Sequence, residues 1–508
     1  MSINIPIHPD QAAIVAALES GAATGAHQPL KRVDTHMSHL FLGPERAYKL
    51  KRSLRHSFAD FSTLEARRRM CEAELEVNRD LAPTLYEGVL PIGRRGDGAI
   101  RVGEADRPID WVVSMRRFDD GALLDEIAAA GGLTEGLITE AARVIAAFHE
   151  RLPPRSEVGH TPDYHRTIEG LRRTEAEGAA AQGLGSASEP LLQRLERELA
   201  RHMPLIEARR RAGFVRRGHG DLHLRNICLY QGRVTPFDAL EFDPALATAD
   251  VLYDVAFLFM DLRARGLDAL ANQAMNAYWD ASRQPEEGLA LLPLFMALRA
   301  AVRMAVSVEA GDLTQAAHYR GLGQALVQPG HTRLVAIGGL SGTGKSTLAK
   351  AVAARLGGPC GARILRTDVI RKLNAGAAPS ERLTEQAYNA AARANICQIL
   401  AERAQAALAT HTPVVADATF QDAEFRASIE RSAGVADFTG VWLRGSDAVR
   451  RARIAVRRGD ISDATVEVAL AQREPAQLGP AWRMLDADRT IAALASEVEE
   501  TLGQHIAA

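Results

Sequence analysis

The sequence predicts an α/β protein of more than one domain, whose last third is a doubly wound parallel sheet. Three observations predict this fold class. The chain has 508 residues, which is too many for one hydrophobic core. Its last third opens with an apolar strand, a glycine-rich loop and a helix. Short apolar strands then alternate with helices, a pattern that is typical of a parallel sheet covered on both faces.

The composition is that of a globular protein, with 47% hydrophobic and 24% charged residues and a net charge of −2. A charge so close to zero gives no reason to expect bulk attraction to nucleic acid or to a membrane. The four cysteines form no C-x-x-C pair, which argues against a zinc site or a disulfide framework and fits a reducing cytoplasm. The N-terminus lacks a secretory pattern, and apolar stretches such as 289–298 are too short to span a bilayer. We therefore expect a cytoplasmic protein.

The chain before residue 328 mixes strands and helices. The sequence predicts strands at 35–42 and 46–50, a long charged helix at 61–81 and a buried strand at 111–115. From residue 123 onward the pattern is mostly helical, except at 214–242, where short strands and loops alternate. Gln328-Pro329-Gly330-His331 is a turn-forming break. It predicts a first domain over 1–327 and a second over 331–508.

The second domain carries a complete phosphate-binding loop of the pattern G-x-x-x-x-G-K-[ST]. Its glycines let successive backbone N–H groups point at phosphate oxygens, and the following helix adds a favourable field. Lys345 is expected to bridge the β- and γ-phosphates as a catalytic group, and the Ser346 hydroxyl to bind Mg²⁺. A glycine-rich turn that binds nothing is the alternative. The predicted nucleotide-binding residues are Gly339, Ser341, Gly342, Thr343, Gly344, Lys345, Ser346 and Thr347.

Two aspartates follow the next strands of this sheet. Asp368 and Arg371 lie just past a strand end, where a doubly wound sheet faces its ligand crevice. The segment resembles the small P-loop kinases of the polynucleotide kinase, gluconate kinase and chloramphenicol phosphotransferase group. That resemblance implies that Asp368 is the base for the acceptor hydroxyl, with Arg371 near an anionic group; an ordinary loop aspartate is the alternative. Asp417 is expected either to steady Mg²⁺ through water or to cap a turn.

An arginine-rich helix follows at 450–460. In the same P-loop kinases such a helix is a lid that closes over ATP and supplies guanidinium groups to the developing charge. By this resemblance Arg453 and Arg457 are candidate nucleotide contacts. The alternative is a solvated helix face.

A second phosphotransfer pattern lies in the middle of the chain, in His219-Gly220-Asp221-Leu222-His223-Leu224-Arg225-Asn226, with Asp238 on the next strand. The protein-kinase catalytic loop uses this order, with an aspartate beside the acceptor hydroxyl and an asparagine and a second aspartate on Mg²⁺. The form H-G-D-L-H-x-x-N resembles the aminoglycoside phosphotransferase and choline kinase branch. The resemblance implies a two-lobed protein-kinase-like fold, with an N-lobe over about 1–115 and a C-lobe over about 116–327. Asp221 is then the predicted base, and Asn226 and Asp238 the predicted Mg²⁺ ligands; a chance match in a polar loop is the alternative.

A kinase N-lobe also supplies a lysine for the nucleotide phosphates and a glutamate that orients it. Lys49 and Lys51 share one face of their predicted strand, and the resemblance favours Lys49. Glu74 is the preferred glutamate and Glu72 its rival. Met115 opens the predicted hinge beside adenine. The first hairpin lacks a G-x-G-x-x-G loop, as the aminoglycoside phosphotransferase branch often does.

Three further aspartates surround this pattern. Asp250 and Asp254 are predicted at i and i+4 on one helical face, where they brace the catalytic loop by hydrogen bonds. Asp243 is a further candidate neighbour of Mg²⁺.

Taken whole, the chain resembles a bacterial family described as bifunctional, in which an aminoglycoside-phosphotransferase-like domain is fused to a P-loop kinase of the AAA-33 type. The resemblance implies ATP- and Mg²⁺-dependent phosphorylation of hydroxyl groups on small metabolites, at two sites. Two rivals stay open. The P-loop domain could be a nucleic-acid 5′-hydroxyl kinase, against which the near-neutral charge argues. One domain could instead be a regulatory ATP-binding module.

Overall fold

In a computed structural model, the described residues are 7–55, 60–181, 187–377, 381–455 and 472–504. They form two compact units. The first comprises the described parts of Met1–His160 and Ile206–Leu258, and the second those of Thr161–Leu205 and Phe259–Ala508. The second unit thus joins helices from the middle of the chain to the C-terminal sheet. The domain boundary near residue 328 stays a prediction.

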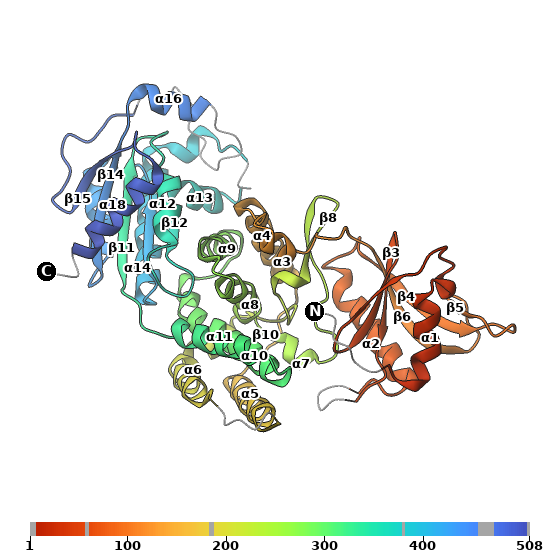
Figure 1. Ribbon diagram of the computed structural model, residues 1–508. Coiled ribbons are helices and arrows are strands. Elements are labelled where there is room, and N and C mark those ends of the chain that lie inside the picture. The colour runs from red at the N-terminus through yellow and green to blue at the C-terminus, as the bar shows by residue number, and fades with distance from the viewer. Residues whose placement is uncertain (1–6, 56–59, 182–186, 378–380, 456–471, 505–508) are drawn as a thin grey trace. The chain divides into compact units, whose positions relative to one another are not determined.

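The first unit is built on a six-stranded antiparallel sheet in the order β1-β2-β3-β6-β4-β5 (Figure 1). Successive side chains of β6 point to opposite faces: Val112 joins the cluster under helix α1, and Val113 the cluster under helix α2. The N-terminal elements are α1 (Ala12–Glu19), β1 (Lys31–Asp34), β2 (Ser38–Leu42), β3 (Arg46–Lys51), α2 (Leu64–Arg79), β4 (Tyr86–Arg94), β5 (Ile100–Val102) and β6 (Pro108–Arg116). The strands predicted at 46–50 and 111–115 correspond to β3 and β6, and the helix predicted at 61–81 corresponds to α2. The strand predicted at 35–42 starts only at Ser38, as β2, because residues 35–37 turn the chain from β1 into β2.

Short strands and loops of the first unit carry the second phosphotransfer pattern. The hairpin β8–β9 follows the His219–Asn226 segment, and β7 pairs with β10. The remaining elements of this unit are α3 (Leu124–Ala129), α4 (Glu135–Arg151), β7 (Val215–Arg217), η3 (Leu224–Asn226), β8 (Ile227–Tyr230), β9 (Arg233–Pro236), α7 (Pro244–Ala247), β10 (Thr248–Asp250) and the start of α8 (Val251–Ala264).

The helices of the second unit surround one strongly apolar helix, α10. The stretch Glu286–Glu309 is long and apolar enough to cross a membrane, which corrects the expectation that the apolar stretches here are too short. In its most apolar window of 18 residues, 72% of the residues are buried, and α10 packs against α5 and α11, so its burial is that of a core helix. The helices are α5 (Thr161–Ala181), α6 (Glu189–Arg211), α9 (Asp268–Ala281), η4 (Glu286–Leu291), α10 (Leu292–Glu309) and α11 (Leu313–Leu326).

The C-terminal part of the second unit is a parallel sheet of five strands in the order β12-β13-β11-β14-β15 (Figure 1). The strand order reverses direction at β11, so the loop after β11 lies at a topological switch point, where such sheets bind ligands. Helices α12 and α18 pack with the sheet in one hydrophobic cluster, and α14 packs on β11, β12 and β13. The elements are β11 (Arg333–Gly339), α12 (Lys345–Ala353), β12 (Arg363–Arg366), α13 (Thr367–Asn374), η5 (Glu385–Tyr388), α14 (Ala390–Ala409), β13 (Val414–Asp417), α15 (Ala423–Ser432), β14 (Asp437–Arg444), α16 (Asp447–Ala455), β15 (Trp482–Asp486) and α18 (Ile491–Gln504).

Candidate active sites

The first unit gathers two lysines and two further carboxylates around Glu74. Lys49 and Lys51 lie two residues apart on β3, so both side chains reach the same face of the sheet. Lys49 Nζ donates to Glu74 Oε1 at 2.8 Å and also pairs with Asp238. Lys51 Nζ lies 2.5 Å from Glu74 Oε2 and also pairs with Glu241. Glu74 therefore links both lysines.

Both lysines, Glu74 and Glu241 are buried, whereas the Asp238 side chain is 38% exposed, and each lysine lies between two carboxylates. Glu74 is 0% exposed. Burial would raise the pKa of its carboxyl, but the charges of Lys49 and Lys51 hold that pKa at about 2. Burial likewise opposes the charge on Lys49, yet Asp238 and Glu74 raise its pKa well above the ordinary value. The rival Glu72 is exposed and pairs with Arg68 at 2.9 Å, so it takes no part in the cluster.

The predicted catalytic loop is held by the start of α8. The Asp254 carboxylate accepts hydrogen bonds from the backbone N–H of His219 (2.8 Å) and of Gly220 (2.7 Å). Gly220 has φ +82°, and a Cβ there would lie 2.9 Å from the Cβ of Leu240, so this position favours glycine. The predicted bracing role of Asp254 thus has a definite geometry.

Within this loop, Asn226 and Asp221 contact each other directly. Asn226 Nδ2 donates to Asp221 Oδ2 and to the Asp221 backbone carbonyl, both at 2.9 Å. The Asp221 side chain is 40% exposed, whereas Asn226 is buried. The amide therefore orients the carboxylate predicted to act as base and leaves it open to a ligand.

His219 ties the catalytic loop to the segment that carries Asp238. Its ring is buried, which lowers its pKa and favours the neutral form. Nε2 lies 2.9 Å from the Phe237 carbonyl oxygen, which can only accept, so Nε2 carries the hydrogen. Nδ1 then accepts from the Asp221 backbone N–H at 3.4 Å. A single neutral histidine thus links the backbone of Asp221, the predicted base, to the backbone of Phe237, which precedes the predicted metal ligand Asp238.

Asp238 itself adopts a left-handed backbone conformation, with φ 62°. For a residue other than glycine this costs on the order of 1–3 kcal/mol and occurs mainly where the surroundings enforce it. Here Tyr86 Oη accepts from the Asp238 N–H at 3.2 Å, and Asn78 Oδ1 accepts from the Ala239 N–H at 3.0 Å. The sheet and helix α2 thus fix the direction of the Asp238 carboxylate.

Three other predicted neighbours have simpler settings. Met115 is buried near the end of β6, paired in the sheet with Ala47 and Tyr86. Asp250 does not share a helical face with Asp254, because it ends β10 and forms a two-point ion pair with Arg209 (2.7 and 2.8 Å). Asp243 caps α7 by accepting from the Ala245 N–H at 2.9 Å.

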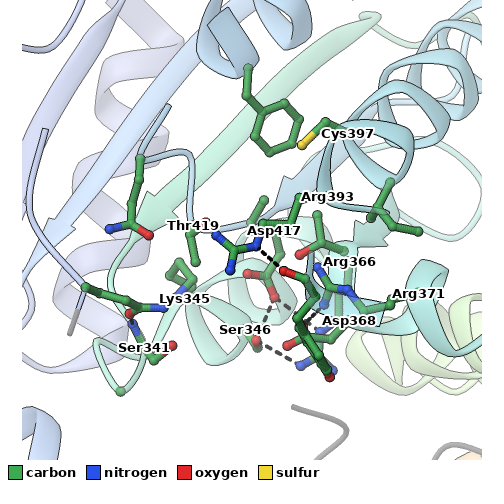
Figure 2. A pocket seen from close by; sticks show the side chains of 18 of the residues that line it. Ser341, Lys345, Ser346, Arg366, Asp368, Arg371, Arg393, Cys397, Asp417 and Thr419 are labelled. Carbon is green, nitrogen blue, oxygen red and sulfur yellow. Dashed lines mark hydrogen bonds and ion pairs between the residues drawn. The ribbon is translucent and has the colours of Figure 1, made fainter. Parts of the chain in front are cut away.

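The second site is formed by the loop between β11 and α12 and by the end of β13. Ser346 Oγ donates to Asp417 Oδ2 at 2.6 Å, and Arg366 Nη2 donates to Ser346 Oγ at 3.0 Å (Figure 2). Asp417 is 5% exposed. Of the two roles predicted for Asp417, its side-chain contact favours the one beside the hydroxyl that is predicted to bind Mg²⁺.

The backbone of the phosphate loop is held by arginines of α16. Arg450 Nε donates to the Ser341 carbonyl and Arg453 Nη1 to the Thr343 carbonyl, both at 3.0 Å. Gly342 has φ +87°, and a Cβ there would lie 2.8 Å from the Arg450 carbonyl oxygen. The predicted lid arginine Arg453 therefore touches the loop, whereas Arg457 lies outside the described residues.

Two polar side chains of this site bind backbone groups of the phosphate loop. Lys345 Nζ donates to the Leu340 carbonyl at 2.9 Å. Gln472 Oε1 accepts from the Ser341 N–H at 2.7 Å. An amide oxygen thus occupies one of the N–H donors that such loops offer to phosphate, and nothing in the motif pointed to Gln472.

A cavity of about 1400 Å³ extends from this loop past α13 to the start of α14 (Figure 2). Sites for single small ligands measure roughly 300–1,000 Å³, so this one has room for a nucleotide and an acceptor. Beside the predicted base, Arg371 Nη1 donates to Asp368 Oδ1 at 2.9 Å, and the Arg371 guanidinium lies 4.7 Å from the centre of the Tyr388 ring. Arg393 Nε donates to the Tyr388 carbonyl at 2.7 Å. The sequence indicated Asp368 and Arg371 but not Tyr388 or Arg393.

The oxygen donors at both sites suit Mg²⁺ that arrives with a nucleotide. Among the residues that the structure describes, no three His, Cys, Asp or Glu side chains form a metal cage of their own. Asp417 lies beside the Ser346 hydroxyl. Asp238 follows Phe237, whose N–H donates to the Asn226 carbonyl at 2.9 Å, so the predicted pair Asp238 and Asn226 lies on neighbouring segments. Mg²⁺ typically binds one or two carboxylates and completes its shell with water and substrate phosphates.

Comparisons with known proteins match both halves of the chain. The model of the "Phosphotransferase enzyme family" matches residues 71–289, and that of an "AAA domain" matches 334–478. Uncharacterised proteins of Mycobacterium tuberculosis and Mycobacterium bovis are each 30% identical over 463 residues, which is 86% of this chain and 88% of theirs.

Solved structures resemble separate parts of the chain. A choline/ethanolamine kinase family protein from Mesorhizobium loti is 14% identical, covers 63% of this chain and 95% of its own, and has a TM-score of 0.40. A gluconokinase from Sinorhizobium meliloti is 24% identical, covers 35% of this chain and 97% of its own, and has a TM-score of 0.25.

Proposed function

The chain belongs to one family with its mycobacterial relatives. In this chain an aminoglycoside-phosphotransferase-like domain precedes a P-loop kinase domain. From this premise we propose that the protein is a kinase with two active sites. Each site transfers the γ-phosphoryl group of ATP, with Mg²⁺, to a hydroxyl group of a small metabolite. We propose 1–327 and 331–508 as the two domains, and the cytoplasm as their location. The proposal is supported by the residue types that each site brings together. The first has Lys49 paired with Glu74 and Asp238, and Asn226 bonded to Asp221. The second has Lys345, Ser346, Asp417 and Asp368 lining one cavity.

At the first site Lys49 binds the nucleotide phosphates, and Glu74 keeps its ammonium group in place. Asn226 and Asp238 hold Mg²⁺, and Met115 lies at the hinge beside adenine. The Asp221 carboxylate accepts the proton of the acceptor hydroxyl. As that oxygen forms its bond to the γ-phosphorus, the bond between the γ-phosphorus and the β–γ bridging oxygen breaks and ADP leaves.

At the second site the loop from Gly339 to Thr347 binds the phosphates through its N–H groups, with Lys345 on the β- and γ-phosphates. Ser346 and Asp417 hold Mg²⁺. Arg453 faces the nucleotide from α16. Asp368 accepts the proton of the acceptor hydroxyl, and the same bonds form and break as at the first site.

The acceptor of the second site carries an anionic group. Arg371 and Arg393 flank Tyr388 on the acceptor side of the cavity, and within the described residues Arg393 binds a backbone carbonyl rather than a carboxylate. An arginine fork matches the geometry of a carboxylate or a phosphate. A hydroxy acid or a phosphorylated alcohol would therefore present its hydroxyl to Asp368 and its charge to this pair.

The test is transfer of labelled γ-phosphate from ATP–Mg²⁺ into a library of small alcohols, sugars, hydroxy acids and hydroxyacyl-CoAs. The intact protein is compared with Asp221→Ala and Lys345→Ala. We expect each substitution to remove a different product or to block successive steps on one product.

The rival functions give other outcomes in the same assay. If only one substitution has an effect, the other domain is a regulatory ATP-binding module and the two-site proposal is wrong. If the label enters the 5′ end of an oligonucleotide, in a salt-sensitive manner, the P-loop domain is a nucleic-acid kinase.

A further inference from the structure

A buried polar cluster lies in the second unit, away from the residues assigned to phosphate transfer. It joins α9 and η4, which precede residue 328 in the chain, to β12 and α14 of the P-loop sheet. Arg363 is 0% exposed, and Asn272, Asn276 and Glu286 are 5% exposed or less. Buried polar groups are costly unless they are fully hydrogen-bonded, so a cluster of this size indicates a specific arrangement.

Asparagines of α9 bond the open edge of the sheet. Strand β12 is an edge strand, since it pairs only with β13. Asn276 Oδ1 accepts from the Ile364 N–H at 2.7 Å, and Asn276 Nδ2 donates to the Ala362 carbonyl at 3.1 Å. Asn272 Nδ2 donates to the carbonyls of Cys360 (2.7 Å) and Ala362 (2.8 Å). The side chains of one helix thus take the place of a neighbouring strand.

Glu286, at the start of η4, binds two arginines, one on strand β12 and one on helix α14. Its carboxylate accepts from Arg363 Nε at 3.1 Å and from Arg403 Nε at 2.9 Å. Arg363 also binds Asp280 at 2.8 Å and Asn276 at 3.0 Å, so its guanidinium is fixed on several sides. One buried carboxylate therefore connects β12 to α14.

These two elements carry the acceptor side of the second site. Arg363 begins β12, which ends at Arg366 and leads directly to Asp368 and Arg371. Arg403 lies on α14, whose first turns bring Arg393 to the cavity. The phosphate loop and Asp417 lie on β11, α12 and β13, none of which contacts Glu286 through a hydrogen bond among the described residues. Arg366, at the opposite end of β12 from Arg363, contacts Ser346 and Asp417.

We propose that the segment 268–291 forms the rear support of the P-loop acceptor site, and that Glu286 is a positioning residue for acceptor binding. The proposal rests on the proposed function of the second site. Buried ion pairs often add little net stability compared with apolar packing. What this one supplies is the relative placement of Asp368 and Arg371 against Arg393, so that the hydroxyl and the anionic group of one acceptor are held together.

The experiment compares Glu286→Gln with Glu287→Gln in the full-length protein. Glu287 is the adjacent residue and is exposed, so it is a matched control. We expect Glu286→Gln to raise the KM for the acceptor at the second site by roughly ten- to hundredfold, because small misplacements of reacting groups have effects of this size. The affinity for ATP at that site and the turnover of the first site should change less than twofold. Glu287→Gln should match the wild type in all of these.

Hydrogen exchange gives a second readout that needs no activity. In Glu286→Gln the backbone amides of 363–371 and of 390–403 should exchange faster, whereas those of β11 should not change. If acceptor phosphorylation at the second site is absent in the wild type, the proposed function fails, yet the exchange pattern still tests the support by Glu286. Unchanged exchange in both segments, or an equal effect of Glu287→Gln, would overturn the proposal.

A milder variant covers the case in which Glu286→Gln does not fold. Arg403→Lys keeps the positive charge but loses the fork, and the Arg403 side chain is already 22% exposed. We expect a smaller rise in the acceptor KM and faster exchange in 390–403 alone. A change in ATP affinity without a change in the acceptor KM would contradict the role assigned to this cluster.

Discussion

The two candidate sites of this chain are assembled in opposite ways. In the first unit, Lys49 and Asp238 are 189 residues apart in sequence and meet only through the sheet, α2 and the catalytic loop. In the second, the phosphate-loop motif and the serine proposed to bind Mg²⁺ lie within eight consecutive residues. The first site is therefore assembled by tertiary contacts around mostly buried, paired charges, and the second is built on a local backbone structure beside a cavity.

Because of this difference, we expect the charged side chains of the two sites to contribute differently to the free energy of unfolding. Removal of a charge from the first site leaves a buried, oppositely charged partner unpaired, so we expect both the stability of the folded protein and the activity to fall. A charge removed from the phosphate loop leaves the backbone cradle in place, so activity should fall without a loss of stability.

The largest expected effect is that of Lys345→Ala on the second site. Removing a cation from the developing charge should lower turnover there on the order of 10³-fold, while the thermal midpoint stays unchanged. Lys350→Ala, five residues further along α12, is the control. A large drop in thermal stability of Lys345→Ala would break the contrast between the two sites.

The next effect is that of Lys51→Met in the first unit. Lys51 is buried between Glu74 and Glu241, and its loss leaves negative charge in the core. We expect the free energy of unfolding to fall by about 3 kcal/mol, measured by urea denaturation. Lys31→Met, on an exposed position of β1, should be neutral. Equal stability of the two variants would show that the charges around Glu74 are not coupled to folding.

Acid should weaken the first unit through the same cluster. The pKa of Glu74 is depressed to about 2 in the folded protein from an ordinary value of 4.5. Its contribution to stability is therefore complete above about pH 4.5 and is lost as the pH falls toward 2. Urea midpoints measured between pH 6 and 3 should fall more steeply for the wild type than for Glu74→Gln. Parallel curves would be evidence against this account.

The smallest effect is expected from Gln472→Ala at the second site. The Gln472 amide occupies the Ser341 N–H, a group that we expect to bind phosphate, so the amide must leave before nucleotide enters. Its removal should strengthen ATP binding by a few fold, since a hydrogen bond of this kind contributes about 1 kcal/mol. Calorimetric titration with a non-hydrolysable ATP analogue measures this change. Weaker binding in the variant would indicate that Gln472 contacts the nucleotide instead.

How much the sequence could predict follows from the same comparison. The phosphate loop, its strand and its helix were predictable because the motif is contiguous and its backbone chemistry is local. The pairing of Lys49 and Lys51 on one face also followed from strand alternation, and the structure brings both to Glu74. The role of Glu241 could not follow, because it depends on how the loop after Asp238 folds against β3.

Other features depend on tertiary contacts that a single sequence does not display. Asp250 was expected on a helix, but it is the last residue of β10, just before α8 begins, and its carboxylate binds Arg209. Arg363 had the appearance of an ordinary residue before a strand, although it is fully buried against Glu286. The only signal for that cluster was the i, i+4 spacing of Asn272 and Asn276, which places both amides on one face of α9.

The central claim is that this chain has two separate nucleotide sites, and the most direct measurement is the stoichiometry of ATP-analogue binding in the presence of Mg²⁺. Isothermal titration calorimetry should give two molecules per chain for the wild type, one each for Lys49→Ala and Lys345→Ala, and none for the double variant. A wild-type protein that binds one molecule, lost in either single variant, would contradict the claim.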